Sequence, residues 1–109
     1  MGPRMTLPTQ LVLRAMLIDP SREVYGLELC TFAGLASGTI HPILARLENI
    51  GWVESRWEDL DPVEAGRPRR RYYRLTREGA LRAQVALDRV SASRSRVARF
   101  RTGLSGGSA

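Results

Sequence analysis

The hydrophobic residues in the first part of the chain recur at the three- and four-residue steps of a helix with one buried side. Residues 7 to 18 read LPTQLVLRAMLI, and Asp19-Pro20 ends the pattern because a residue before proline is held away from helical geometry. The positions on the apolar stripe are Leu11, Ala15 and Ile18, with Leu13 and Met16 beside them. We therefore predict a first helix that buries this stripe in the core.

A second, shorter helix is predicted through VYGLELCTFAG, residues 24 to 34. Gly34 is a suitable C-terminal stop, since glycine readily adopts the left-handed conformation that follows many helices. Gly26 costs about 1 kcal/mol relative to alanine inside a helix, which indicates a close approach to another backbone. Cys30 is expected to be a small core residue, with a redox or intersubunit thiol as the alternative.

The third predicted helix, SGTIHPILARLENI, begins with Ser37 as its cap and ends at Gly51. Its apolar positions, which we expect to face the core, are Ile40, Ile43, Leu44, Leu47 and Ile50. The positions left outward are Thr39, His41, Pro42, Ala45, Arg46 and Asn49. A helix that met only water would more usually carry Glu and Lys pairs there. These short or planar polar groups, with a histidine that has no evident partner, therefore suggest a binding face.

Two stretches alternate with the period of two that is typical of strands. WVESRWE, residues 52 to 58, places Val53, Ser55 and Trp57 on one face, and RRYYRLT, residues 70 to 76, places Arg71, Tyr73 and Leu75 on one face. DLDPVEAGRPR lies between them and is too long for a tight turn. We predict a two-stranded hairpin with an extended, mobile tip that is acidic on the way out and basic on the way back.

A long fourth helix is predicted from residue 77 to about 101, with Thr76 as its cap. About 24 residues at a rise of about 1.5 Å each reach roughly 36 Å, so part of this helix must project from so small a domain. Its apolar positions are Leu81, Ala83, Val85, Leu87, Val90, Val97 and Phe100. Because this wide apolar side would be exposed on a monomer, we expect a partner helix to cover it. Residues 102 to 109 have the composition of a disordered tail.

Length and composition narrow the class of protein. The 109 residues suffice for one compact domain but not for two. The longest nearly apolar stretch is far shorter than the roughly 20 residues of a membrane span, and no leader sequence precedes it, so we expect a cytoplasmic protein. With one cysteine and one histidine, neither an internal disulfide nor an ordinary metal site can be assembled. No constellation of catalytic groups is recognisable, which argues against an enzyme and implies no cofactor.

The charge is distributed unevenly along the chain, and all 17 basic residues are arginine. Residues 67 to 101 hold 12 arginines and 2 acids, a net charge of +10, whereas residues 1 to 66 hold 5 arginines and 9 acids, a net charge of −4; together these give the +6 of the whole chain. Such asymmetry indicates a half that binds a polyanion, unless the arginines only solvate the surface.

Three helices, a hairpin and a further helix form the order of a winged helix-turn-helix, in which the third helix enters the DNA major groove and the hairpin reaches the adjacent backbone or minor groove. The expected fold is therefore mainly α with a small β-hairpin. Thr39, His41, Arg46 and Asn49 carry groups that can read base edges, and a small Ala45 lets the helix approach the groove. Arg67 and Arg69 are expected to contribute affinity through phosphates.

Three stretches in this order, VYGLEL, SGTIHPILARLENIGWVESRW and RRRYYRLTREG, resemble the PadR family of winged-helix transcriptional regulators, over about residues 9 to 82. The resemblance implies a homodimeric repressor that binds an inverted repeat and is released by a small molecule or a stress signal. It also implies that the fourth helix dimerises, as in the compact branch with one C-terminal helix. The family often has tyrosine where this chain has His41. Some compact relatives line a ligand pocket with an aromatic residue of the fourth helix, which here carries only Phe100.

The resulting assignment has a DNA-binding domain over residues 1–76, a dimerisation helix over 77–101 and a tail over 102–109. The expected DNA-binding residues are Ser37, Thr39, His41, Pro42, Arg46, Asn49, Arg67, Arg69, Arg70 and Tyr72. The expected dimerisation residues are Leu11, Leu81, Val85, Leu87, Val90 and Val97. The alternative is a winged helix that serves only as a protein–protein interaction module. The arginines gathered in the hairpin favour double-stranded DNA as the partner, because an interaction module has no need of them.

Overall fold

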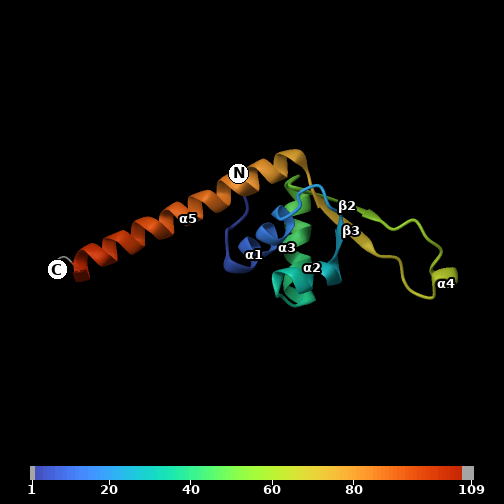
Figure 1. Ribbon diagram of the computed structural model, residues 1–109. Helices are drawn as coiled ribbons and strands as arrows, with labels where there is room; N and C mark the ends of the chain where they lie inside the picture. The colour runs from blue at the N-terminus through green and yellow to red at the C-terminus, as the bar shows by residue number, and fades with distance from the viewer. Residues whose placement is uncertain (1, 107–109) are drawn as a thin grey trace.

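The computed structural model describes residues 2–106, and side chains for residues 2–100. The elements in chain order are α1 (Leu7–Leu17), β1 (Val24–Tyr25), α2 (Gly26–Ala33), α3 (Ser37–Asn49), β2 (Val53–Trp57), α4 (Pro62–Ala65), β3 (Arg71–Leu75) and α5 (Arg77–Gly106). Figure 1 shows α1, α2 and α3 gathered in one body, with the β2–β3 hairpin and α5 extending from it in opposite directions. This arrangement confirms the predicted winged helix-turn-helix with a long C-terminal helix.

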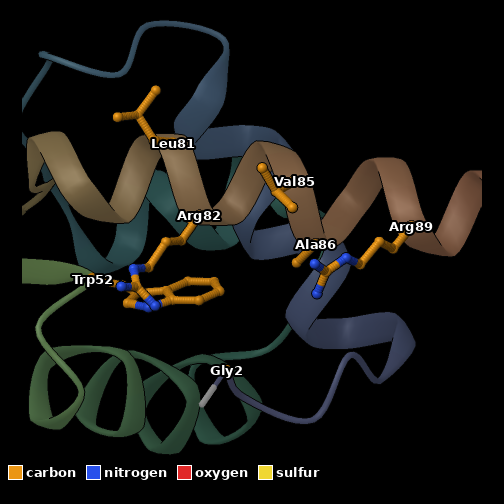
Figure 2. A pocket seen from close by; sticks show the side chains of 7 residues that line it. All are labelled: Gly2, Trp52, Leu81, Arg82, Val85, Ala86 and Arg89. Carbon is orange, nitrogen blue, oxygen red and sulfur yellow. The ribbon is translucent and has the colours of Figure 1, made fainter.

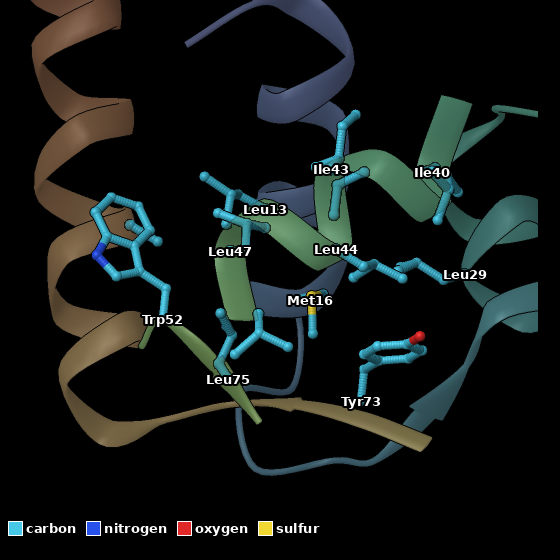
Figure 3. Packing of buried hydrophobic residues seen from close by; sticks show 14 of the residues in the cluster. Leu13, Met16, Leu29, Ile40, Ile43, Leu44, Leu47, Trp52, Tyr73 and Leu75 are labelled. Atoms are coloured by element: carbon cyan, nitrogen blue, oxygen red, sulfur yellow. The ribbon is translucent and has the colours of Figure 1, made fainter. Parts of the chain in front are cut away.

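The core is built where α1, α2, α3 and the sheet meet (Figure 3). Apolar side chains of α3 fill its centre, and those with at most 7% exposure are Ile40, Ile43, Leu44 and Leu47. From α1 the buried side chains are Val12, Leu13 and Met16. The predicted stripe of α1 is therefore wrong in phase, because Ile18 is 84% exposed and Leu11 and Ala15 are only half-buried. Ile50, predicted to be buried at the end of α3, is likewise exposed.

The second predicted helix begins later than its pattern suggested. Val24 and Tyr25 form β1, which pairs antiparallel with Tyr73 and Tyr72 of β3. The sheet therefore has three strands in the order β1-β3-β2 rather than the two of a simple hairpin. Gly34 ends α2 in the left-handed conformation, at φ 69°, as predicted. Cys30 is half-buried and packs against the core instead of lying fully inside it.

The start of α3 also differs from the prediction. Ala36 is the capping residue, and no side chain caps the helix. The Ala36 carbonyl accepts the N–H groups of Thr39 and Ile40, so the helical pattern begins one residue before Ser37 could cap it. Ser37 is instead the first helical residue, with its side chain exposed. Gly51 follows the end of the helix, as expected, with a φ of 82°.

The β2–β3 hairpin, called the wing below, pairs Val53 with Leu75 at the body and Trp57 with Arg71 at the outer end. Trp52 and Val53 are both buried, although strand alternation placed them on opposite faces, because Trp52 precedes β2 and its N–H still bonds to the Leu47 carbonyl of α3. The segment beyond the ladder is not simply extended, since it contains α4, capped by the side chain of Asp61.

α5 begins as predicted, with the Gly79 N–H donating to the Thr76 hydroxyl at 2.9 Å. Its first turn lies so close to Trp52 that a Cβ on Gly79 would meet the Trp52 carbonyl oxygen at 1.9 Å, which only glycine avoids. Ala83 and Leu87 are buried in the core of their own chain, so the prediction that they lie on an exposed stripe is wrong. The helix continues past the predicted end at 101 to Gly106, and residues 107 to 109 lie outside the described residues.

Within residues 2–106, no single helix has the length and hydropathy needed to cross a membrane. Only α2 and α3 taken together meet those criteria, as a pair bent by 108°. The apolar side chains of that pair, Leu29 and Leu44 among them, are occupied in the core.

Candidate nucleic-acid interface

The outward face of α3 carries the polar side chains that the sequence singled out. Because Ile40, Ile43, Leu44 and Leu47 are held in the core, the rest of the helix faces solvent. The residues exposed on that side are Ser37, Thr39, His41, Pro42, Ala45, Arg46 and Asn49. They span the whole length of α3, with the small Ala45 between the larger polar groups. Their arrangement gives a continuous face of hydrogen-bonding groups on a rigid element.

His41 lies against the beginning of α2. A Cβ built on Gly26 would stand 3.1 Å from His41 Cε1 and 3.6 Å from Nε2. The close approach predicted at Gly26 is therefore to a side chain of α3 and not to another backbone. His41 in turn has a neighbour, which its position in the sequence did not reveal. A larger residue at position 26 would have to displace the imidazole ring.

Arg46 lies one turn beyond Pro42 on the same exposed face. Within the described part of the chain, no carboxylate forms an ion pair with its guanidinium. This distinguishes it from the arginines that pair with acids, which are Arg22, Arg56, Arg67, Arg71, Arg74 and Arg82. Arg46 therefore retains its planar set of N–H donors for a ligand, in the geometry that suits the O6 and N7 atoms of guanine.

The wing holds its predicted arginines in three different ways. Arg67 forms a two-point ion pair with Glu58, at 2.7 Å and 3.0 Å. Arg69 Nε donates to the Leu60 carbonyl at 2.9 Å. The guanidinium of Arg70 lies over the ring of Tyr25, 4.3 Å from its centroid. Of these three cations, Arg67 is the one neutralised by a carboxylate.

Tyr72 belongs to a small cluster on the outer face of the sheet. Its ring meets that of Tyr25 edge to face, with centroids 5.8 Å apart, and Arg56 lies over it at 5.3 Å. Arg56 is held in turn by the Glu23 carboxylate at 2.6 Å, which raises the pKa of the guanidinium and lowers that of the acid. Tyr25 was not singled out from the sequence, because β1 has only two residues and gives no periodic signal. Arg56 lies in the predicted strand β2, but the strand pattern did not indicate its contacts with Tyr72 and Glu23.

A polar link joins the end of α3 to the wing. The Ser55 hydroxyl donates to Glu48 Oε2 at 2.5 Å, and Arg71 Nη2 donates to Ser55 Oγ at 2.9 Å. Arg71 Nη2 also reaches Glu48 Oε1 at 3.5 Å, and its guanidinium lies over Trp57. Since the three residues come from α3, β2 and β3, the link ties the end of α3 to both strands of the wing. The sequence offered no signal for it beyond the strand register.

The predicted dimerisation residues divide into two groups. Leu81, Val85 and Val97 expose their side chains along α5, and Val90 and Leu11 are half-buried. Leu87 is only 6% exposed and belongs to the core of its own chain, so it offers little surface to a partner. Figure 2 shows Leu81 and Val85 beside a hollow of about 260 Å³ between α5 and Trp52. The residues that line it are Gly2, Trp52, Leu81, Arg82, Val85, Ala86 and Arg89.

Several solved structures of similar fold are PadR or PadR-like transcription regulators. A PadR family transcription regulator from Clostridium difficile R20291 superposes with a TM-score of 0.69 at 21% identity, over 87% of this chain and 98% of that one. A PadR family regulator from Eggerthella lenta DSM 2243 gives 0.68 at 22% identity, over 86% and 83%. A PadR-like regulator from Bacillus cereus ATCC 14579 gives 0.64 at 23% identity, over 87% and 91%.

At these identities the structural likeness establishes the fold alone. No curated protein matches the chain in sequence. The sequence model of the transcriptional regulator PadR-like family, however, matches residues 16–85. The matched segment runs from α1 through the wing into the first turns of α5. Because it covers well over half of the 109 residues, the protein belongs to the PadR-like family of transcriptional regulators.

Proposed function

We propose that the protein is a homodimeric repressor that binds an inverted-repeat operator in double-stranded DNA and is released by a small molecule or another signal. The observation that supports this most directly is the exposed face of α3, where His41, Arg46 and Asn49 stand on the side opposite the core. An α-helix fits the major groove of DNA, where arginine and asparagine side chains can each make paired hydrogen bonds to a base. Membership of a family of regulators, rather than of enzymes, supports the same reading.

The remaining residues of α3 are assigned to positioning on the duplex. Ser37 and Thr39 lie in its first turn, where hydroxyl and backbone N–H groups commonly reach phosphate oxygens. Pro42 and Ala45 add little bulk to the face, so the helix can lie deep in the groove. The helix therefore supplies both register and base contacts.

The wing supplies contacts to the phosphate backbone. Arg69 and Arg70 carry guanidinium groups that no carboxylate neutralises within the described residues, and the phenol of Tyr72 lies in the same part of the sheet. Such contacts add affinity and fix orientation but carry little sequence information. The wing is therefore assigned to affinity and α3 to choice of sequence.

The second copy is placed on α5. This helix of 30 residues projects from the body and makes the molecule elongated, with extents of 70, 25 and 21 Å. It exposes Leu81, Val85 and Val97. An apolar helix face of this length is best covered by the same face of a second copy about a two-fold axis, with Val90 and Leu11 at its margin. Two copies related in this way would present two α3 helices to the two halves of an inverted repeat.

The experiment that tests the proposal is a mobility-shift titration of duplex DNA over a series of salt concentrations, followed by selection of bound fragments from a random pool. If a dimer neutralises six to ten phosphates, log affinity should fall against log salt with a slope of about −5 to −9. The selected fragments should share an inverted repeat. A flat salt response would contradict DNA binding and favour a protein–protein interaction module.

Assembly is tested separately by sedimentation of the purified protein at micromolar concentration. The full chain should be a dimer, and a variant that ends after Val90 should dimerise and bind the operator much more weakly, since Val97 and the projecting part of α5 are lost and two half-sites act together less often. The truncation is placed there because Leu87 belongs to the core and must be kept. A monomeric full-length protein would contradict the dimer.

A further inference from the structure

A single carboxylate closes the base of the wing loop, residues 58 to 70. Glu58 Oε1 accepts from Arg67 Nη1 at 2.7 Å, and Glu58 Oε2 accepts from Arg67 Nη2 at 3.0 Å. Oε1 also accepts the backbone N–H of Arg70 at 3.2 Å, while the Glu58 N–H donates to the Arg70 carbonyl at 2.8 Å. Glu58 therefore binds two points of the segment that leads back to β3, Arg67 and Arg70, through its side chain and its backbone.

Apart from the hydrogen bonds within and around α4, the contacts that cross this loop come from Glu58 and from the arginines that follow α4. The strand ladder ends where Trp57 pairs with Arg71, and α4 is a single turn of four residues, too short to be stable without neighbours. Arg67 Nη1 donates a further bond to the Pro68 carbonyl at 3.2 Å, and Arg69 Nε donates to Leu60 across the loop. Arginine side chains thus bond across the wing loop, whose backbone turns back at α4 at the outer end of the wing (Figure 1).

The ion pair of Glu58 and Arg67 also limits which arginines of the wing are available to DNA. The hydrogen bonds from Arg67 lower the pKa of Glu58 to about 2, against the opposing effect of burial, with the Arg70 N–H assisting. The pair is therefore charged at neutral pH, and both terminal nitrogens of Arg67 are directed at the carboxylate. Arg69 and Arg70 make no ion pair within the described residues.

We infer that Glu58 and Arg67 are positioning residues for DNA binding: their ion pair holds the wing loop closed, and Arg69 and Arg70 are the arginines that reach phosphates. The inference rests on the proposed function and refines it. It gives Arg67 a different role from the phosphate contact that arginine clustering alone indicates. It also gives a role to an acidic residue, which charge alone would count as unfavourable near DNA.

Glu58→Ala distinguishes a positioning role from a purely electrostatic one, because the two roles predict opposite changes in affinity for DNA. If Glu58 acted only through its negative charge, its removal would strengthen binding to DNA. As a positioning residue it should instead weaken binding, by about 3- to 10-fold, since a charge-assisted contact that orders the loop is lost. The measurement is a salt-series titration of the full-length protein against a fragment that the native protein selects. Tighter binding by Glu58→Ala would overturn the inference.

Arg67→Ala and the double variant of Glu58 and Arg67 complete a double-mutant cycle. A positioning Arg67 should lower affinity without changing the salt slope, whereas a phosphate-binding Arg67 should make the slope shallower by about two units per dimer. The double variant should bind no more weakly than either single variant, because both remove the same ion pair. A shallower slope in Arg67→Ala, or double-variant affinity restored to the native level, would overturn the inference.

Glu54→Ala is the matched control. Glu54 binds Arg74 at 2.5 Å on the same sheet, so its removal changes the charge equally but leaves the wing loop untouched. It should bind DNA as tightly as the native protein or more tightly, and a loss equal to that of Glu58→Ala would count against the ion pair's special role.

Amide hydrogen exchange tests the closed loop without DNA. In Glu58→Ala the amides of residues 59 to 70 should exchange faster, with those of α3 unchanged. Unchanged exchange in the loop would refute the closing role of Glu58 even if DNA binding is confirmed. If the native protein binds no DNA, the proposed function is refuted, and with it the binding role of Glu58. Faster exchange in Glu58→Ala would still show in that case that Glu58 closes the loop.

Discussion

α3 and the wing were both assigned to DNA from the sequence, but on different grounds and with different results. In α3 the assignment rested on helical phase, and each polar residue placed outward is exposed. In the wing it rested on a cluster of arginines, of which Arg67 is paired with Glu58. Helical phase follows from the chain's own repeat, whereas the availability of a charge depends on its neighbours in space. A periodic pattern therefore identifies a surface more dependably than a count of charges.

The acidic first part and the basic second part of the chain also show that the availability of a charge depends on its neighbours in space. Three acids of the acidic half, Glu48, Glu54 and Glu58, pair with arginines of the basic half. The net charges of −4 and +10 are correct as sums, but folding brings part of the two halves together. The cationic groups left for a polyanion are consequently fewer than the sequence suggested. On α3 and the wing, the arginines without an ion pair among the described residues are Arg46, Arg69 and Arg70.

The largest effect that separates the two faces of α3 is expected from Leu47→Ala. Leu47 is fully buried, so its truncation should cost roughly 2 to 5 kcal/mol of unfolding free energy through lost burial and an unfilled cavity. Arg46→Ala, one residue away on the exposed face, should change stability by less than about 0.5 kcal/mol. Urea denaturation of both variants measures the difference. Equal losses would show that α3 does not have one buried and one free face.

The next effect concerns base reading by His41. His41→Ala should weaken operator binding by about 1 to 3 kcal/mol and relax the preference at one symmetric pair of positions, with little change in thermal midpoint. Gly26→Ala should alter the same positions, because the added methyl group would press on the His41 ring. Selection of bound fragments by each variant measures this. Early melting of His41→Ala, or selection of an unchanged operator, would identify His41 as a packing residue.

A smaller effect is expected in the wing. Arg69→Ala should lower affinity for operator and random DNA about equally and make the salt slope shallower by up to about two units per dimer. In the double variant of Arg67 and Arg69, the sequence alone predicts a change of up to about four units, whereas an internally paired Arg67 limits it to about two. Titrations at several salt concentrations distinguish these values. If Arg69→Ala instead lost the preference for particular DNA sequences, the choice of sequence would have to be assigned to the wing and not to α3.

The smallest effect concerns pH. A carboxylate whose pKa is lowered by folding stabilises the folded arrangement at any pH above the ordinary pKa of that carboxyl group. This contribution is lost as the pH falls through the lowered pKa. With the pKa of Glu58 lowered to about 2, its contact with Arg67 should be constant between about pH 5 and 8 and fail only in strong acid. Carboxyl-carbon NMR of Glu58 should show this, and Arg67→Ala should raise the midpoint toward the usual value of about 4.3.

Several features of the fold could be predicted because their causes lie within a few residues of chain. The buried side of α3 follows from the spacing of Ile40, Ile43, Leu44 and Leu47. Gly34 ends α2, and Thr76 caps α5 with a hydrogen bond to Gly79, three residues away. The length of α5 likewise follows from a long run without proline. These are local interactions, so the sequence by itself determined the order of the longer elements, α1, α2, α3, β2, β3 and α5, and the exposed face of α3.

Other features were decided only when distant segments met. Val24 and Tyr25 resemble the start of a helix, and they form a strand because the edge of β3 pairs with them about 48 residues later in the chain. Leu87 is apolar like its neighbours on α5, yet it is buried because the domain packs on that side of the helix. Arg67 is drawn inward by Glu58 across the wing loop. All three outcomes depend on which surfaces come into contact: the pairing of a strand, the burial of one side of a helix that has apolar residues on several sides, and the neutralisation of a charge. Only the tertiary structure determines those contacts.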